Sequence, residues 1–200
     1  MKTLCTIFFA CAFIFVTQAQ TAFKTKPGLK YPIVKRPSLV DFDAFEKLTA
    51  EVKQHRASHL VTMENFLRMS KVLNTIILDT RSDSMYNAKH IKGALHLNFS
   101  DFNQFSLARL IPDTNTTILI YCNNNFADDP VYFVTKIAPP QPIILPKAKA
   151  PITLALNIPT YINLYGYGYK NVYELSELRS IHDPAISFEG TAVATTVVNK

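Results

Sequence analysis

Cysteine is scarce in this sequence, and its few positions limit what can hold the fold together. The 200 residues contain three cysteines. Two of them, Cys5 and Cys11, lie in an apolar N-terminal stretch with the features of a cleaved signal. The remaining chain then has Cys122 alone, which excludes an internal disulfide and requires a hydrophobic core. A single thiol of this kind is either a small buried apolar group or a reactive nucleophile.

The N-terminal apolar run is too short to cross a bilayer. Lys2 precedes the apolar core over residues 4–16, and Thr17-Gln18-Ala19 has a small-x-Ala pattern. This order predicts a signal peptide at residues 1–19, an exported (periplasmic or secreted) mature protein that begins near Gln20, and no membrane span after cleavage. Acylation of Cys11 is the weaker alternative, because bulky residues precede it and the apolar run continues beyond it.

No segment interleaves aromatic and basic residues, which argues against nucleic-acid binding despite a formal net charge of +6. The basic residues are scattered, apart from a cluster in the proline-containing segment 20–40, which we interpret as an extended, solvated arm. The histidines lack metal-ligand spacing, and Asp128 and Asp129 beside Cys122 are not expected to form a metal site. We therefore predict no metal and no cofactor.

Apolar, strand-like segments alternate with helical patterns along the rest of the chain. The expected strands are 59–62, 76–79, 95–98, 117–121 and 172–175. The expected helices are 42–55 with Asp41 as cap, 63–72 with Thr62 as cap, 83–89, a short one near 102–110, and 152–165 with Pro159 as a kink or first-turn residue. Because most of the strands are apolar throughout, we predict an α/β domain of three layers, in which helices flank a small, mainly parallel central sheet.

The predicted organisation has a flanking helix at 41–58, a domain at 59–182 and a weakly ordered tail at 183–200. Prolines crowd residues 130–150, which we expect to be a long insertion with a short strand at 142–145. Such a segment is a candidate dock for a protein partner, because proline-rich chain binds in extended form.

The strand 117–121 is the most apolar of the set, and Cys122 follows it directly. In parallel α/β sheets, ligands bind just beyond the carboxyl ends of the strands. Cys122 therefore lies where a nucleophile is expected, at the edge of a pocket.

Several of these residues together resemble a rhodanese domain over about residues 59–178. The resemblance is carried by Ile77-Leu78-Asp79-Thr80-Arg81, Tyr86, His90-Ile91-Lys92-Gly93-Ala94, Ile120-Tyr121-Cys122 and Gly168-Tyr169-Lys170-Asn171-Val172-Tyr173-Glu174-Leu175. It implies that Cys122 carries a sulfane sulfur as a persulfide, which a small anion such as thiosulfate supplies and a thiol accepts. It also implies that the backbone N–H groups of the following loop surround that sulfur. These loop residues are Asn123, Asn124, Asn125, Phe126 and Ala127.

Other residues of the pattern have supporting roles. Asp79 and Arg81 are expected to tie loops together, and His90 to be a hydrogen-bonded turn residue. Met85 stands where the family tends to place an acid that pairs with Arg81, so Asp83 is the available substitute.

The loop departs from active family members in two ways. Ala127 stands near the position of a common arginine, and Asp128 and Asp129 follow, whose carboxylates are expected to raise the pKa of Cys122. The proline-rich segment also separates the loop from the next helix, which affects how a helix dipole acts on the sulfur.

Two functions fit these observations. The first is a sulfur carrier and candidate sulfurtransferase that works through a Cys122 persulfide. The second is a non-catalytic rhodanese-like binding module that uses the altered loop and the insertion. A phosphatase on the same fold needs a loop arginine, which residues 123–127 lack.

Overall fold

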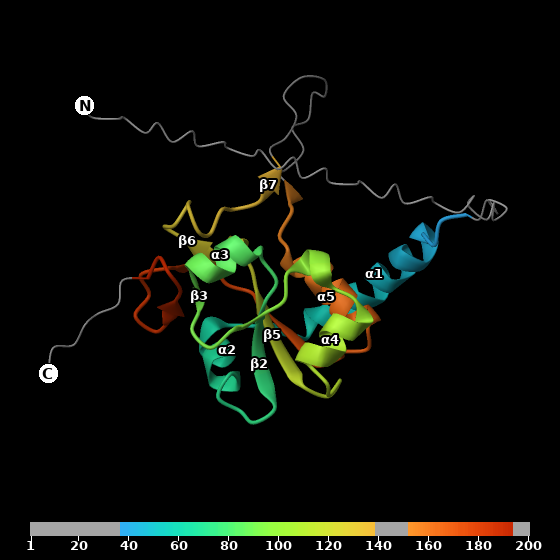
Figure 1. Ribbon diagram of the computed structural model, residues 1–200, viewed down its shortest axis with the longest axis horizontal. Helices are drawn as coiled ribbons and strands as arrows, with labels where there is room; N and C mark the ends of the chain where they lie inside the picture. Colours follow the sequence, from blue (N-terminus) through green and yellow to red (C-terminus); the bar gives the residue numbers. More distant parts are fainter. Residues whose placement is uncertain (1–36, 139–151, 194–200) are drawn as a thin grey trace, which may run out of the picture. The chain divides into compact units, whose positions relative to one another are not determined.

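The computed structural model of the protein describes residues 37–138 and 152–193 (Figure 1). The chain divides into two units, residues 1–39 and 40–200, and every described helix and strand lies in the second. The predicted signal peptide, nearly all of the predicted arm, the 142–145 strand and the end of the tail lie outside the described residues.

The centre of the second unit is a five-stranded sheet in the order β1-β9-β5-β2-β4, and every pairing in it is parallel. Its strands are β1 (Leu60–Val61), β2 (Thr75–Asp79), β4 (Leu95–His96), β5 (Thr117–Tyr121) and β9 (Val172–Leu175). All five were expected from the sequence, and the predicted α/β fold with a parallel central sheet is confirmed.

The helices cover both faces of this sheet (Figure 1). They are α1 (Phe42–Ala57), α2 (Met63–Met69), α3 (Asp83–Ala88), α4 (Gln104–Leu110) and α5 (Asn157–Gly166). The predicted caps are present: the Asp41 side chain accepts the N–H of Ala44 at 2.9 Å, and the Thr62 hydroxyl accepts that of Asn65 at 3.3 Å.

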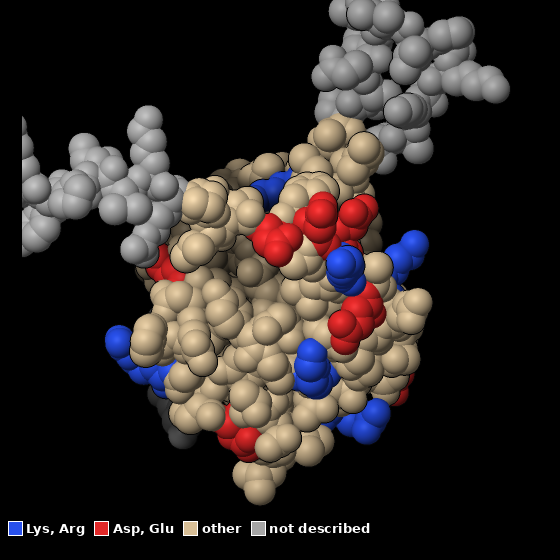
Figure 2. All heavy atoms as spheres, turned by 90° about the vertical axis from the view of Figure 1, so that its right-hand side faces the viewer, with Lys and Arg blue, Asp and Glu red and all other residues tan. Residues whose placement is uncertain are grey.

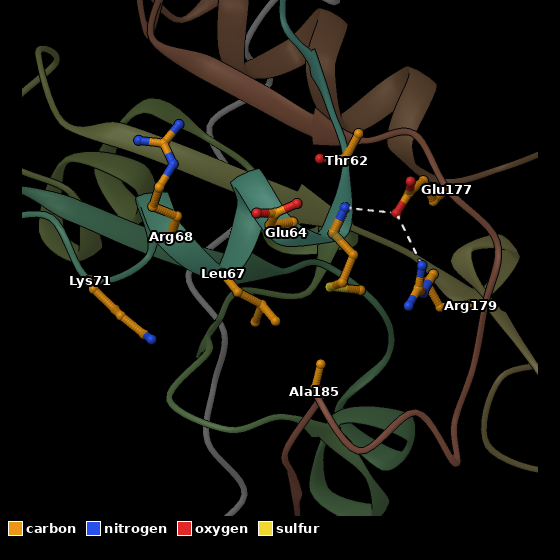
Figure 3. A pocket seen from close by; sticks show the side chains of 9 residues that line it. Thr62, Glu64, Leu67, Arg68, Lys71, Glu177, Arg179 and Ala185 are labelled. Carbon is orange, nitrogen blue, oxygen red and sulfur yellow. Dashed lines mark hydrogen bonds and ion pairs between the residues drawn. The ribbon is translucent and has the colours of Figure 1, made fainter.

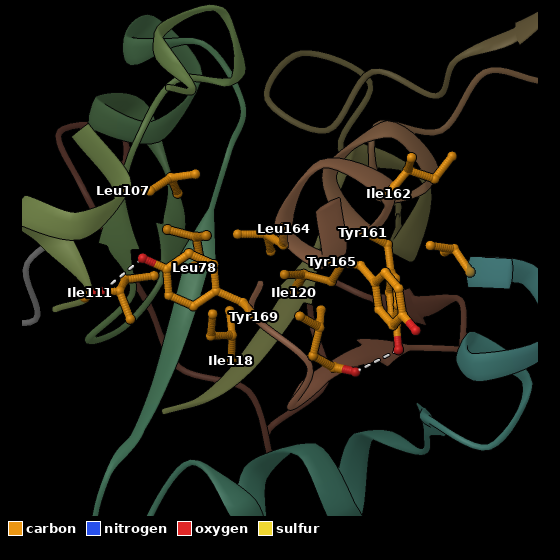
Figure 4. Packing of buried hydrophobic residues seen from close by; sticks show 12 residues of the cluster. Leu78, Leu107, Ile111, Ile118, Ile120, Tyr161, Ile162, Leu164, Tyr165 and Tyr169 are labelled. Atoms are coloured by element: carbon orange, nitrogen blue, oxygen red, sulfur yellow. Dashed lines mark hydrogen bonds between the residues drawn. The ribbon is translucent and has the colours of Figure 1, made fainter. Parts of the chain in front are cut away.

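Strand β5 divides the core into two layers because successive side chains of a strand point to opposite faces. Ile118 and Ile120 pack with α4 and α5, in the cluster drawn in Figure 4. Leu119 and Tyr121 pack on the other face, with Met63 and other residues. Burial on both faces explains why β5 is apolar throughout its length.

Two predicted segments differ from the structure. Ile152–Thr153 form strand β8, which pairs antiparallel with β7 (Ile137–Ala138), so the helix predicted from 152 begins five residues later. Pro159 lies in the first turn of α5, where backbone N–H groups have no partner within the helix. The N–H that proline lacks therefore costs the helix no hydrogen bond. In the tail predicted to be weakly ordered, β11 (Phe188–Glu189) pairs with β3 (His90–Ile91).

The face of the protein drawn in Figure 2 carries acidic and basic side chains interspersed over a mostly uncharged surface. Among residues 37–138 and 152–193, no helix has the length and apolar character needed to span a membrane.

Candidate functional site

Cys122 follows β5 directly, at the carboxyl edge of the sheet, and begins a short 3-10 helix, η2 (Asn123–Asn125). Its side chain is almost fully enclosed, with 1% of the residue exposed. The predicted position at the strand end is therefore present, and the thiol lies beneath the surface of the site.

Backbone N–H groups from two separate segments act on the Cys122 sulfur. They belong to Asn157 and Leu156 at the start of α5 and to Asn124 in η2. Burial raises the pKa of the Cys122 thiol above its ordinary value of 9.0, and hydrogen bonds from these N–H groups oppose that rise. The first turn of α5 thus reaches the sulfur even though the proline-rich insertion separates the two in sequence.

This arrangement alters the predicted ring of amides from residues 123–127. The N–H of Asn125 donates to the Cys122 carbonyl at 3.1 Å, and that of Phe126 donates to the Asn123 carbonyl. Phe126 and Ala127 form β6, which pairs with β10 (Arg179–Ser180). The N–H groups around the sulfur, here called the cradle, therefore come from Asn124 and Asn125 in η2 and from the start of α5, while Phe126 and Ala127 hold the turn in place.

The Asn125 side chain fixes the backbone around Cys122. Its Oδ1 accepts the Cys122 N–H at 2.9 Å, and its Nδ2 donates to the carbonyls of Leu175 and Glu177 at 2.8 and 3.1 Å. The Nδ2 of Asn157 donates to the same Oδ1 at 3.0 Å. These buried bonds join the cysteine turn to β9 and α5.

Glu174 is the carboxylate that affects the thiol. It lies on β9 opposite Ile120 of β5, is 5% exposed, and its negative charge contributes to the raised pKa of Cys122, after the larger effect of burial. From the sequence, Asp128 and Asp129 were expected to have that role, but Asp129 pairs with Lys89 at 2.7 Å. The only signal for Glu174 was one charged residue inside an otherwise apolar strand.

Asp79 and Arg81 form a buried ion pair, with 2.7 Å between Asp79 Oδ2 and Arg81 Nη2. Arg81 Nη1 donates to the Tyr132 carbonyl at 2.9 Å, and Nη2 also donates to the Lys89 carbonyl at 2.6 Å. Arg81 thus ties three loops together. The suggested substitute partner, Asp83, was wrong, because Asp83 pairs with His96 at 2.9 Å.

His90 is held in the β3 turn. Its Nδ1 lies 2.6 Å from the Tyr86 carbonyl, and its ring stacks on the Tyr86 ring at 3.8 Å between centroids. At the other edge of the ring, Nε2 lies 3.3 Å from Glu189 Oε1, so stacking and hydrogen bonding hold the ring as expected of a turn residue.

A cavity of about 330 Å³ lies next to the cysteine turn. It is lined by Arg81, Ser82, Met85, Asn123, Val134, Lys136 and Leu156. Asn124 holds one wall, since its side chain pairs with the backbone N–H and carbonyl of Lys136 at 3.0 and 3.1 Å. The wall residue Leu156 also supplies an N–H to the sulfur, so this cavity adjoins the cradle.

A second cavity, of about 600 Å³, lies along α2 (Figure 3). Glu177 crosses its wall, where it accepts the Met63 N–H at 2.8 Å and lies 3.7 Å from Arg179. Its lining contains neither Cys122 nor any other residue of the predicted site. In the described part of the chain, no group of three or more His, Cys, Asp or Glu side chains is arranged to hold a metal ion.

The family model for the rhodanese-like domain matches residues 62–177. The chain belongs to the rhodanese-like family. This match begins after α1 and includes Cys122, the whole insertion and all of α5. The cysteine-bearing turn and the α5 start thus lie within the rhodanese-like region, while Arg56 lies outside it.

Two solved structures are similar to this rhodanese-like chain. One is a rhodanese with anions from E. coli, at 18% identity and a TM-score of 0.35, covering 58% of this chain and 98% of that one. The other is the BH2092 protein from Bacillus halodurans, at 15% identity and a TM-score of 0.37, covering 65% of this chain and 74% of that one. A comparison with curated proteins found no match.

Proposed function

We propose that this protein is a sulfur carrier in which Cys122 holds sulfane sulfur as a persulfide. The observation that supports the proposal is the position of Cys122 at the carboxyl end of β5, where its side chain accepts a backbone N–H of η2 and the N–H groups of Asn124, Leu156 and Asn157 oppose the rise in the pKa of the thiol. Amides at a helix start stabilise an anion, and a persulfide is an anion at neutral pH. Membership of the rhodanese-like family gives the same class of chemistry.

The proposed reaction has two displacements. The Cys122 thiolate attacks the outer sulfur of a donor such as thiosulfate, the sulfur–sulfur bond of the donor breaks, and sulfite leaves with the bonding electron pair. A thiolate acceptor then attacks the outer sulfur of the persulfide, takes it as its own persulfide, and restores the Cys122 thiolate. No external oxidant or reductant is needed, because sulfane sulfur passes unchanged in oxidation state.

The donor enters through the cavity beside the cysteine turn. Arg81 is 3% exposed and its guanidinium is engaged with Asp79 and loop carbonyls, so Lys136 is the exposed cation on the cavity wall. Because Cys122 is enclosed, loading requires a local opening of this wall. The Asn124–Lys136 bonds are the contacts that such an opening breaks.

Mass spectrometry of the intact protein after thiosulfate treatment tests the proposal. We expect a gain of one sulfur on the wild type that a thiol reductant removes, and no gain on Cys122→Ser. An absence of any adduct across thiosulfate, thiosulfonate and polysulfide donors would overturn sulfur transfer.

A non-catalytic binding module is the second candidate, and the apolar surface near the insertion favours it. Exposed apolar side chains gather on the segments that flank it: Val131, Val134, Ile137, Ile152 and Leu154. Apolar patches of this kind mark interaction surfaces. A variant in which a short Gly-Ser linker replaces residues 139–150 retains the residues of β7 and β8 and the buried Phe133. A partner that binds the shortened protein as well as the wild type would exclude the insertion as its dock.

We also propose that the protein is exported. The supporting feature is the N-terminal order of Lys2, an apolar core and a small-x-Ala site. N-terminal sequencing of the protein from its native source tests this, with a start near Gln20 expected. A chain that retains residues 1–19 would contradict it.

A further inference from the structure

Helix α1 is attached to the domain by apolar packing of Leu48 and Val52 and by a set of polar contacts. Val52 is its one fully buried residue in the described structure. Three side chains from its second half make the polar contacts: Glu51 accepts the Tyr165 hydroxyl, His55 Nδ1 lies 2.9 Å from the Tyr161 hydroxyl, and Arg56 pairs with Glu174. The first two contacts reach α5, and the third reaches the central sheet.

The Arg56–Glu174 pair has the two-pronged geometry of a strong arginine–carboxylate contact. The Nη2 of Arg56 lies 2.6 Å from Glu174 Oε1, and its Nε donates to Oε2. The Arg56 side chain is 28% exposed and that of Glu174 is 6% exposed. Glu174 is therefore a buried carboxylate whose countercharge comes from the flanking helix.

An unbroken series of hydrogen bonds connects this pair to the cysteine. Glu174 Oε1 lies 3.3 Å from Asn157 Nδ2, which also donates to Asn125 Oδ1 at 3.0 Å. That oxygen accepts the Cys122 N–H at 2.9 Å. The orientation of Glu174 thus helps to fix the position of Asn157, whose backbone N–H is part of the sulfur cradle.

We propose that Arg56 is a positioning residue for Cys122: it neutralises and orients Glu174, and through Asn157 and Asn125 it keeps the cradle in place. The inference rests on Cys122 being the reacting thiol of the proposed function. Arg56 precedes the family-matched residues 62–177, so α1 completes the site from outside the matched region.

The charges around Glu174 determine whether the loss of Arg56 raises or lowers the pKa of Cys122. Arg56 pairs with the Glu174 carboxylate, the Glu174 charge acts on Cys122 and Tyr161, and His55 of α1 faces the Tyr161 hydroxyl at 2.9 Å. Burial raises the pKa of Tyr161, so this phenol stays neutral and Arg56 is the cation that offsets the carboxylate. Without Arg56, the Glu174 charge opposes the Cys122 thiolate in full.

The rate of Cys122 alkylation by iodoacetamide, measured against pH in the full-length protein, tests the proposal. We expect Arg56→Gln to move the profile to higher pH and to lower the rate at a fixed pH by about tenfold, which corresponds to one pKa unit. Glu174→Gln is expected to move it to lower pH, and Arg56→Lys to restore most of the wild-type profile. Glu51→Gln, which loosens the same helix at a different contact, is the matched control and should leave the profile unchanged.

A wild-type profile in folded Arg56→Gln, or the same upward shift in Glu51→Gln, would overturn the proposal, since the second result assigns the effect to helix attachment alone. If Arg56→Gln does not fold, a Glu174→Gln profile that fails to move down has the same consequence. The pH midpoint of alkylation depends on the ionisation of the thiol and needs no persulfide, so a shift of the expected sign without any persulfide would reject the proposed function and support the role of Arg56.

Discussion

The side-chain Oδ1 of Asn125 accepts the backbone N–H of Cys122 at 2.9 Å, from within the same four-residue turn. One buried amide therefore fixes the backbone of the candidate nucleophile, and its Nδ2 holds two carbonyls of the chain that leaves β9.

Asn125→Leu leaves these buried groups without partners. Each unpaired buried group costs about 1–3 kcal/mol, so we expect a loss of about 3 kcal/mol or more in the free energy of unfolding. Urea denaturation measures it. The adjacent Asn124→Ala is the control, because its side chain bonds the exposed Lys136 backbone, and we expect a loss below about 1 kcal/mol there. Equal losses in the two variants would contradict the role assigned to Asn125.

Burial raises the pKa of the Cys122 thiol above 9.0, which sets the pH dependence of sulfur loading. Only the thiolate attacks, so the loading rate is expected to rise about tenfold per pH unit below the pKa and to be still rising at pH 9. The same raised pKa means that the unfolded chain loses this proton first, so its contribution to stability is lost as the pH rises through the folded pKa. Stopped-flow loading with thiosulfate measures the rate, and a plateau below pH 8 would contradict the expectation.

The strands and the cysteine position followed from the sequence because their signals are local. The residues of an apolar run such as 117–121 indicate directly that the strand is buried. The side-chain caps Asp41 and Thr62 lie next to the helices that they start. The N–H groups that α5 contributes to the sulfur cradle could not be predicted from the sequence in the same way. The insertion hides the fact that Leu156 and Asn157 return to Cys122, since this contact spans more than thirty residues of chain.

The partners of the charged side chains were the other feature that the sequence did not reveal. Nearness in sequence suggested that Asp128 and Asp129 act on the thiol, whereas the fold pairs Asp129 with Lys89 and brings Glu174 across from β9. Arg56 was assigned only to a flanking helix. Pairing between strands and helices is set by tertiary packing, which a single sequence does not reveal.

Asp79→Asn tests the buried ion pair with Arg81. The substitution leaves an enclosed guanidinium without its counter-ion and weakens the bond from the Tyr121 hydroxyl, which is 2.6 Å long. Breaking a buried pair on one side costs about 3–5 kcal/mol, and thermal or urea unfolding measures that loss. Asp83→Asn removes an exposed carboxylate from the His96 pair and is expected to change stability little. A small effect at Asp79 would show that Arg81 finds other partners.

Lys136→Met tests whether the cavity beside the cysteine turn admits the donor. The lysine is the exposed cation of the lining, so we expect a several-fold higher KM for thiosulfate and little change in kcat once the persulfide forms. The effect should shrink at high salt, where exposed charges are screened. Lys71→Met in the cavity along α2 is the matched control. An unchanged KM in Lys136→Met would place donor entry elsewhere.

Gly190 tests the packing of the C-terminal segment onto α3. Its φ is +130°, and a Cβ at this position would lie 2.4 Å from the Ala88 carbonyl oxygen. The next two N–H groups, of Thr191 and Ala192, donate to the Asn87 and Ala88 carbonyls at 2.9 Å each. A side chain at 190 therefore forces the segment away from α3 and breaks these bonds.

Gly190→Ala is accordingly expected to destabilise the protein by about 2–4 kcal/mol, since it combines backbone strain with a clash. Gly93→Ala is the matched control: Gly93 has φ +80° but open space around its would-be Cβ, so strain of about 1 kcal/mol is its only cost. Urea unfolding of both variants measures the difference. Equal losses in the free energy of unfolding would mean that residues 188–192 do not pack on α3. That result would agree with the weakly ordered tail predicted from the sequence alone.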